Sequence, residues 1–234
     1  MRPVLSLLAL SLIAVPSAAA QSSWRSHLDP ARLRVASDSF AFLVDGQPRG
    51  WQKLAASRAG DGWILSDEVQ MGTVVQQRSD ARFGPGFVQQ SLRQEGTARG
   101  KAMKIVLDRT GTRVKGTALT PTGGDAELPI DVEASEDVID DNAVAPLLPF
   151  IAWGEGMSFT IPVLKSGKGT IAPNAVTVRG KGTVTVGAGT FEAWQVVVSE
   201  GDRPWLEAHV TTTAPYRVVR MGPPGGRMAV ELVK

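Results

Sequence analysis

Alternation of hydrophobic and polar residues is the dominant pattern of the chain after residue 36. Phe40, Phe42 and Val44 fall on one face of an extended segment and are followed by the turn residues Asp45 and Gly46. The same two-residue period recurs between glycines and prolines, which is typical of short antiparallel strands joined by tight turns. The other segments of this kind in the first two thirds of the chain are 63–71, 103–107, 113–119, 128–132 and 159–163.

The last third of the chain shows the strand pattern most clearly. Alternating runs are separated by turn residues at 187–189, 201–202 and 223–226. Connections this short favour pairing between consecutive strands, so a meander is predicted. Pro129 and Pro162 lie inside two of the predicted strands, and we expect both at sheet edges or bulges because proline donates no hydrogen bond. The predicted C-terminal strands are 183–186, 191–198, 205–213, 216–221 and 228–233.

One segment in the middle of the chain departs from this period. Ser135 can cap a helix, and Glu136 and Asp137 suit its first turn. Pro146 should end or kink the helix. The fold class that follows is all-β, with a curved antiparallel sheet and one short helix or loop on its concave face.

The densest hydrophobic cluster follows this predicted helix. Two interpretations remain open: it packs as ordinary core against the sheet, or it acts as a plug or lid over an apolar cavity that binds a ligand. The residues of the cluster, which are the candidate ligand-binding residues, are Leu147, Leu148, Phe150, Ile151 and Trp153.

The N-terminus has the three parts of a cleavable signal peptide. Arg2 precedes an apolar run that ends at Pro16, and the small residues 17–20 follow. Cleavage after Ala20 would place Gln21 at the new terminus and the protein in the periplasm or outside the cell. No later segment reaches the length of a membrane span, and the chain has no cysteine for a lipid anchor or a disulfide.

The remainder is predicted to be one β-rich domain at 37–234, preceded by a flexible segment at 21–36. The whole chain has 25 Lys and Arg against 23 Asp and Glu, with a formal net charge of +2. Charges of both signs are interspersed, so the composition does not favour a nucleic-acid-binding protein.

The C-terminal meander resembles a family of exported bacterial proteins of unknown function, which is distantly similar to the half-barrels of LolA/LolB-type lipoprotein carriers. The resemblance rests on the residues at 187–196, on Trp205 and on the residues at 214–220. It implies a curved sheet with an apolar hollow beneath a helix or loop, and it brings no catalytic residues.

Candidate chemistry is sparse elsewhere in the chain. His209 lies two residues after Glu207 in a predicted strand, so the pair could supply a general base, but a solvent-facing strand histidine is the favoured interpretation because no nucleophile motif points to this place. The acidic residues between 125 and 141 lack the spacing of an EF-hand. No nucleophile or phosphate-binding motif occurs, so we predict no catalytic residue, metal or cofactor.

Three functions are compatible with these patterns. The first is an exported protein that binds a lipid, an acyl chain or another apolar ligand in a half-barrel cavity. The alternative is a structural or interaction protein of the cell envelope, whose partner is another envelope protein and which holds no small ligand. The third is an enzyme that uses Glu207 and His209 or the acidic cluster.

Overall fold

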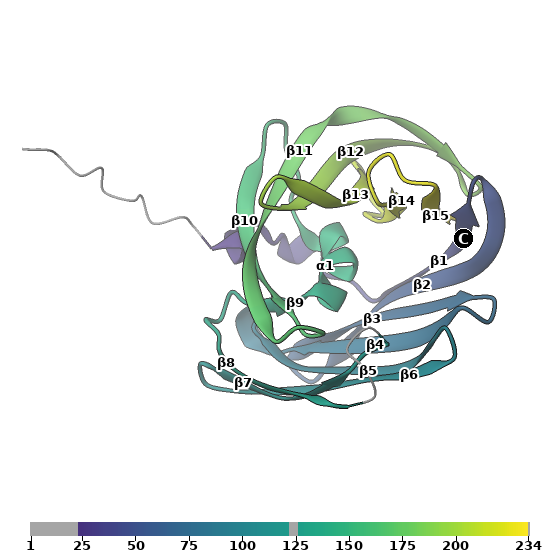
Figure 1. The fold of residues 1–234 in the computed structure, drawn as a ribbon. Helices are drawn as coiled ribbons and strands as arrows, with labels where there is room; N and C mark the ends of the chain where they lie inside the picture. Colours follow the sequence, from purple (N-terminus) through teal and green to yellow (C-terminus); the bar gives the residue numbers. More distant parts are fainter. Residues whose placement is uncertain (1–22, 122–125, 234) are drawn as a thin grey trace, which may run out of the picture.

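The strands form one antiparallel sheet that coils into a barrel-like shape, with a single short helix inside it (Figure 1). The computed structural model describes residues 23–121 and 126–233, so the predicted signal peptide lies outside the described residues. The strands are β1 (Ala36–Val44), β2 (Gln47–Ala59), β3 (Gly62–Met71), β4 (Val75–Phe83), β5 (Gln89–Ala98), β6 (Lys101–Thr110), β7 (Arg113–Leu119), β8 (Leu128–Glu133), β9 (Ile139–Asp140), β10 (Ser158–Lys165), β11 (Thr170–Val186), β12 (Gly189–Glu200), β13 (Arg203–Thr211), β14 (Val218–Gly222) and β15 (Met228–Leu232).

Two meanders meet where the first strand pairs with the last. The order across the sheet is β8-β7-β6-β5-β4-β3-β2-β1-β15-β14-β13-β12-β11-β10-β9. Every neighbouring pair is antiparallel except β9 with β10, which is parallel and joins only Ile139 to Val163 and Asp140 to Leu164. The sheet therefore does not close through hydrogen bonds, because β8 and β9 are its two free edges.

Glycines at inward-curving positions let the sheet coil. A Cβ atom at Gly50 would lie 1.9 Å from the carbonyl oxygen of Gln70, and one at Gly96 would lie 2.0 Å from that of Gln76. Neither distance is compatible with any side chain, so these strands approach closely only because glycine occupies both positions.

The predicted fold class is confirmed: the sheet is curved, antiparallel and all-β, and the one α-helix, α1 (Asp141–Leu147), lies on its concave side. The two prolines also agree with their prediction. Pro129 is on the edge strand β8. Pro162 lies in the half of β10 that β9 leaves unpaired.

The predicted start of the helix is wrong. Residues 135–138 form a turn, and α1 begins six residues later than Ser135, with the Asp140 carboxylate accepting a hydrogen bond from the backbone N–H of Asn142. Pro146 lies inside α1 near its end, and the short 3-10 helix η4 (Leu148–Phe150) follows.

The segment before the sheet packs on the barrel. Residues 24–32 form two short 3-10 helices, η1 (Trp24–His27) and η2 (Pro30–Arg32). Trp24 is fully buried, and its indole N–H donates to the carbonyl of Asp137 at 2.7 Å. The remaining 3-10 helix, η3 (Pro85–Phe87), joins β4 to β5. No helix among the described residues has the length and apolar character needed to span a membrane.

Candidate functional site

The five predicted ligand-binding residues come together inside the barrel. They belong to a segment that we call the plug, residues 139–153, which comprises β9, α1, η4 and the three residues that follow η4. The relative exposures of the five side chains lie between 0% and 6%. Phe150 and Trp63 of β3 have ring centroids 6.2 Å apart, and Trp153 stacks on Phe159 of β10 at 6.0 Å. The plug thus occupies the interior of the coiled sheet (Figure 1).

Few backbone hydrogen bonds hold the plug in this place. Among the described residues, two backbone hydrogen bonds join residues 142–153 to other segments: the N–H of Asp29 donates to the carbonyl of Phe150, and the N–H of Ala152 donates to the carbonyl of His27. Both connect the plug to the segment before β1, and backbone pairing with the wall occurs at the start of the plug, where β9 pairs with β10. The indole N–H of Trp153 donates within the plug, to the carbonyl of Leu148 at 2.9 Å. Contact between plug and wall is therefore mainly apolar packing.

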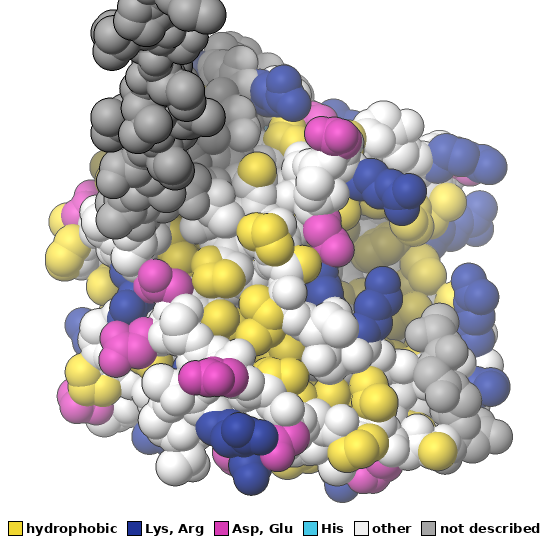
Figure 2. Space-filling view, turned by 60° about the vertical axis from the view of Figure 1, so that its left-hand side comes forward, with side chains coloured by type: hydrophobic (Ala, Val, Ile, Leu, Met, Phe, Trp, Pro, Cys, Tyr) yellow, Lys and Arg dark blue, Asp and Glu magenta, His cyan; other side chains and the backbone are white. Residues whose placement is uncertain are grey.

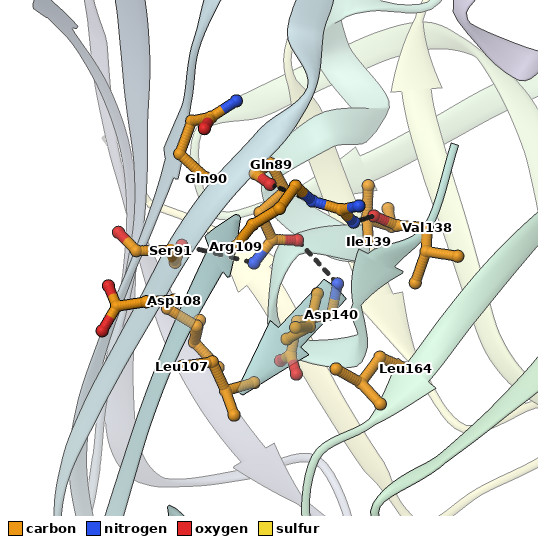
Figure 3. Close-up of a pocket in the computed structure, with 12 residues that line it drawn as sticks. Gln89, Gln90, Ser91, Leu107, Asp108, Arg109, Val138, Ile139, Asp140 and Leu164 are labelled. Atoms are coloured by element: carbon orange, nitrogen blue, oxygen red, sulfur yellow. Dashed lines mark hydrogen bonds between the residues drawn. The ribbon is translucent and has the colours of Figure 1, made fainter. Parts of the chain in front are cut away.

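Side chains of β5 anchor the start of the plug. They lie near the gap between the edge strands β8 and β9, which we call the seam. The backbone N–H of Asp140 donates to the Gln89 side chain at 2.7 Å, and Asn142 accepts from the side chain of Gln94 at 3.2 Å. Figure 3 shows Gln89 and Arg109 reaching toward Asp140 and Val138, whereas Gln90, Ser91 and Asp108 point away from them.

Arg109 of β6 bridges this seam. Its guanidinium donates to the carbonyl of Gln89 on β5 and to those of Ala134, Ser135 and Val138, at 2.7 to 3.1 Å. Burial lowers the pKa of Arg109. One side chain therefore ties the connection between β8 and β9 to the wall.

Replacing Arg109 with methionine should lower the free energy of unfolding by about 2 kcal/mol, because four carbonyl groups lose a charged donor. Urea denaturation of the variant and of Arg179→Met, an exposed position on β11, makes the comparison. Equal midpoints for both variants would contradict a role of Arg109 at the seam.

The cavities beside the plug are small. One, lined by Gln89, Leu107, Arg109, Ile139, Asp140 and Leu164 among others, measures about 20 Å³ (Figure 3). A second, on the other side of the plug, has the same volume. Each holds about one water molecule. In this arrangement neither cavity accommodates an acyl chain.

Buried carboxyl groups lie around the first turn of α1. Burial and the neighbouring Asp141 raise the pKa of Asp140 well above its ordinary value, and burial raises the pKa of Asp141. The Oδ2 atom of Asp140 and the hydroxyl of Ser166 are buried without a hydrogen-bond partner. Burial also raises the pKa of Asp67, on the inner face of β3, to about 6, although Gln52 donates to it at 2.7 Å.

The remaining candidates do not join this site. His209 and Glu207 lie on β13, with Nε2 and Oε1 4.0 Å apart, and Gln195 donates to Glu207. Burial lowers the pKa of His209. Of the acidic residues, Asp137 binds Ser23 and Arg25, and no cluster of three potential metal ligands occurs in the described residues. The described residues therefore show no arrangement that supports a catalytic role for His209 and Glu207 or a metal-binding role for the acidic residues.

The residues that sequence reasoning missed are those of the seam. Gln89, Gln94 and Arg109 lie in strands, and nothing in their local pattern distinguishes them from other polar strand positions. Asp140 carried a signal, since an aspartate before an apolar run can cap a helix. Asp140 lies in an acidic stretch, however, and Ser135 was the stronger candidate for the N-cap of the helix.

A comparison with protein families decides the membership of this chain. The family described as "Protein of unknown function (DUF3108)" matches residues 65–219. The chain belongs to this DUF3108 family. A search of curated proteins finds no match.

Among solved structures, the chain is similar to a β-barrel-like protein of the domain of unknown function DUF1849 from Brucella abortus. The two share 10% sequence identity with a TM-score of 0.52, over 87% of this chain and 97% of the other. At this identity the likeness concerns the fold alone. It agrees with the barrel-like sheet of this DUF3108 protein.

Proposed function

We propose that this DUF3108 protein is an exported binding protein that takes up a lipid, an acyl chain or another apolar ligand into the barrel when the plug moves aside. The export rests on the signal-peptide pattern of residues 1–20, and the comparison with LolA/LolB-type carriers rests on the sequence resemblance alone. The third basis of the proposal is the position of the plug, residues 139–153, inside the barrel.

The observation that carries the proposal is how the plug is held. Its central residues contact the wall through apolar side chains and make their two backbone hydrogen bonds with His27 and Asp29. An apolar ligand that replaced the plug would restore the contacts of the wall and leave few backbone groups of the wall unpaired.

The open seam supports the same proposal. The edge strands β8 and β9 are not paired to each other, and Arg109 of β6 and Gln89 of β5 instead tie the connection between these strands, and β9 itself, to the wall. On the face of the molecule that Figure 2 turns forward, hydrophobic side chains lie at the surface, and Lys and Arg side chains border a recess.

A disulfide lock tests the proposal. Leu28 and Ile151 form an isolated antiparallel bridge flanked by the two backbone hydrogen bonds, so their Cα atoms should be about 4.5 Å apart. The chain has no native cysteine, so Leu28→Cys with Ile151→Cys forms one defined disulfide. We expect the oxidised variant to lose binding of a fluorescent 16-carbon acyl chain, and dithiothreitol to restore it.

The two single-cysteine variants are the matched controls, since they carry each substitution without the cross-link. Circular dichroism checks that every variant folds. Equal binding by the oxidised and reduced forms would place the ligand elsewhere. No binding by the unmodified protein, together with no lipid in its organic extract after purification without detergent, would overturn the proposal and favour an envelope protein as the partner.

A further inference from the structure

A cluster of charged side chains lies where the barrel wall meets the C-terminal half of the plug. Arg34 precedes β1, Asp38 is on β1, and Arg217 precedes β14. The Nη2 atom of Arg217 is 3.6 Å from the Asp38 carboxylate. Arg34 donates to the carbonyl of Tyr216 at 3.3 Å. Residues far apart in the sequence thus form one cationic group.

This cationic group has more donors than acceptors. Asp38 is 8% exposed, and its carboxylate interacts with the charges of both guanidinium groups. Burial raises its pKa, and the charges of Arg217 and Arg34 oppose that rise. The Nε atoms of Arg34 and Arg217 are both buried and have no acceptor among the described residues. A buried charged donor without a partner is costly, so an acceptor at this point would be stabilising.

The neighbouring Arg32 is different, although its guanidinium lies 3.8 Å from the centre of the Tyr216 ring. It forms an ion pair with Asp29 at 3.3 Å and donates to the carbonyl of Ile151 at 2.8 Å. The Nε and Nη1 donors of Arg32 therefore have acceptors within the protein, and its Nε is not left unpaired as those of Arg34 and Arg217 are. The shortage of acceptors is specific to Arg34 and Arg217.

The space beside the cluster is mainly apolar, with two charged residues, Arg34 and Asp38, at its border. The cavity of about 20 Å³ on this side of the plug is bounded by Arg34, Asp38 and Tyr216 and by apolar side chains. Three of its lining residues, Pro146, Pro149 and Phe150, belong to the plug. Movement of the plug would therefore enlarge this cavity and join it to the apolar interior. The apolar residues of the wall in this cavity are Ala36, Leu54, Ala55 and Ala56.

We infer that Arg34 and Arg217 bind the anionic head group of an amphiphile whose acyl chain replaces the plug. This inference rests on the proposed function and names its ligand class: a single chain that ends in a carboxylate or a phosphate monoester. Guanidinium groups suit both anions, because their N–H donors match two oxygens of one head group.

Binding of hexadecanoic acid and of its methyl ester, measured below their critical micelle concentrations, tests the inference. We expect the unmodified protein to bind the acid at least about tenfold more tightly, as hydrogen bonds to a charged group would give. The double variant Arg34→Gln with Arg217→Gln should lose this preference and keep its affinity for the ester. The double variant to lysine, which keeps both charges, should retain part of the preference.

Arg179→Gln, at an exposed position of β11, is the control for a change of net charge and should bind as the unmodified protein does. Thermal unfolding checks that the glutamine variant is folded; if it is not, the lysine variant and the acid-to-ester ratio of the unmodified protein decide. Equal affinity for acid and ester overturns the inference and leaves the proposed function intact. Binding of neither contradicts the proposed function itself.

Acetate and inorganic phosphate distinguish an amphiphile from a free anion. We expect neither, at millimolar concentration, to displace the 16-carbon acid. Displacement by either small anion would show a site for free anions and would overturn the assignment to an amphiphile. Dodecyl phosphate in place of the acid then shows whether carboxylate or phosphate is preferred, and binding of either in preference to its neutral analogue supports the inference.

Discussion

Replacing Trp153 with alanine should lower the free energy of unfolding by about 3–5 kcal/mol, the range for large-to-small substitution of a buried tryptophan. The side chain is 6% exposed, stacks on Phe159 and donates to the carbonyl of Leu148. The substitution leaves both a cavity and an unpaired carbonyl group. Chemical denaturation followed by circular dichroism measures the change.

Trp51→Ala on β2 is the matched control, because this indole is 39% exposed on the outer face of the sheet. Its substitution should change the free energy of unfolding by less than about 1 kcal/mol. A cost at Trp153 as small as that at Trp51 would show that the plug contributes little to the folded state, and that it is a loosely docked lid.

A large cost at Trp153 and ligand binding are compatible. The contacts that stabilise the plug are apolar, so a chain of similar volume can replace them after the plug leaves. The two interpretations of the hydrophobic cluster from sequence, core and plug, then describe two states of one segment. The disulfide lock at Leu28 and Ile151 separates them, because oxidation and reduction of the same variant change the freedom of the plug to move without changing its side chains.

Strand positions were predictable only in part. In β1 and β3 the apolar residues alternate, and both strands lie where the alternation placed them. The strands β2, β4 and β5 also pack one face on the core but were not predicted, because polar residues occupy some of their buried positions and weaken the apolar alternation. The N-terminal half of β11 was missed, since Pro173 and Gly180 interrupt its period. Tertiary pairing overrides that local signal: Pro173 faces Pro162 within the β10–β11 ladder, and Gly180 lies at a register shift opposite Gln195.

The start of the helix was not predictable from local residues because they serve a tertiary contact. The carboxylate of Asp137 accepts from Ser23 and from Arg25, and its carbonyl accepts from Trp24. These bonds dock the N-terminal segment, so the turn at 135–138 is fixed by residues more than one hundred positions away. Asp140 is therefore the residue that caps the N-terminus of α1.

The cationic group of Arg34 and Arg217 was beyond sequence reasoning for a similar reason. Each arginine lies just before a strand, where a basic residue is ordinary. Only the antiparallel pairing of β1 with β15, and of β15 with β14, brings these two positions of the chain near each other. The five apolar plug residues were found because they are adjacent in sequence.

The pH dependence of stability should report on the buried carboxyl of Asp67. Its pKa in the folded protein is about 6, above the value of 3.8 for an exposed group, so the folded state binds the proton more tightly than the unfolded state. Stability then falls as the pH rises from about 4 to about 6 and stays lower above it. The shift corresponds to a cost of about 3 kcal/mol at neutral pH.

Asp67→Asn removes this cost and keeps an oxygen that can accept from Gln52. We expect the variant to exceed the unmodified protein by up to about 3 kcal/mol in free energy of unfolding at pH 7.5 and to match it at pH 4. The difference between the two proteins isolates Asp67, since Asp140 and Asp141 are present in both. Asp45→Asn is the opposite control. Arg227 lowers the pKa of that exposed carboxyl, so replacing Asp45 should not raise the free energy of unfolding at any pH. A difference at Asp67 that does not change with pH would show that its carboxyl is already neutral, or already solvated, inside the barrel.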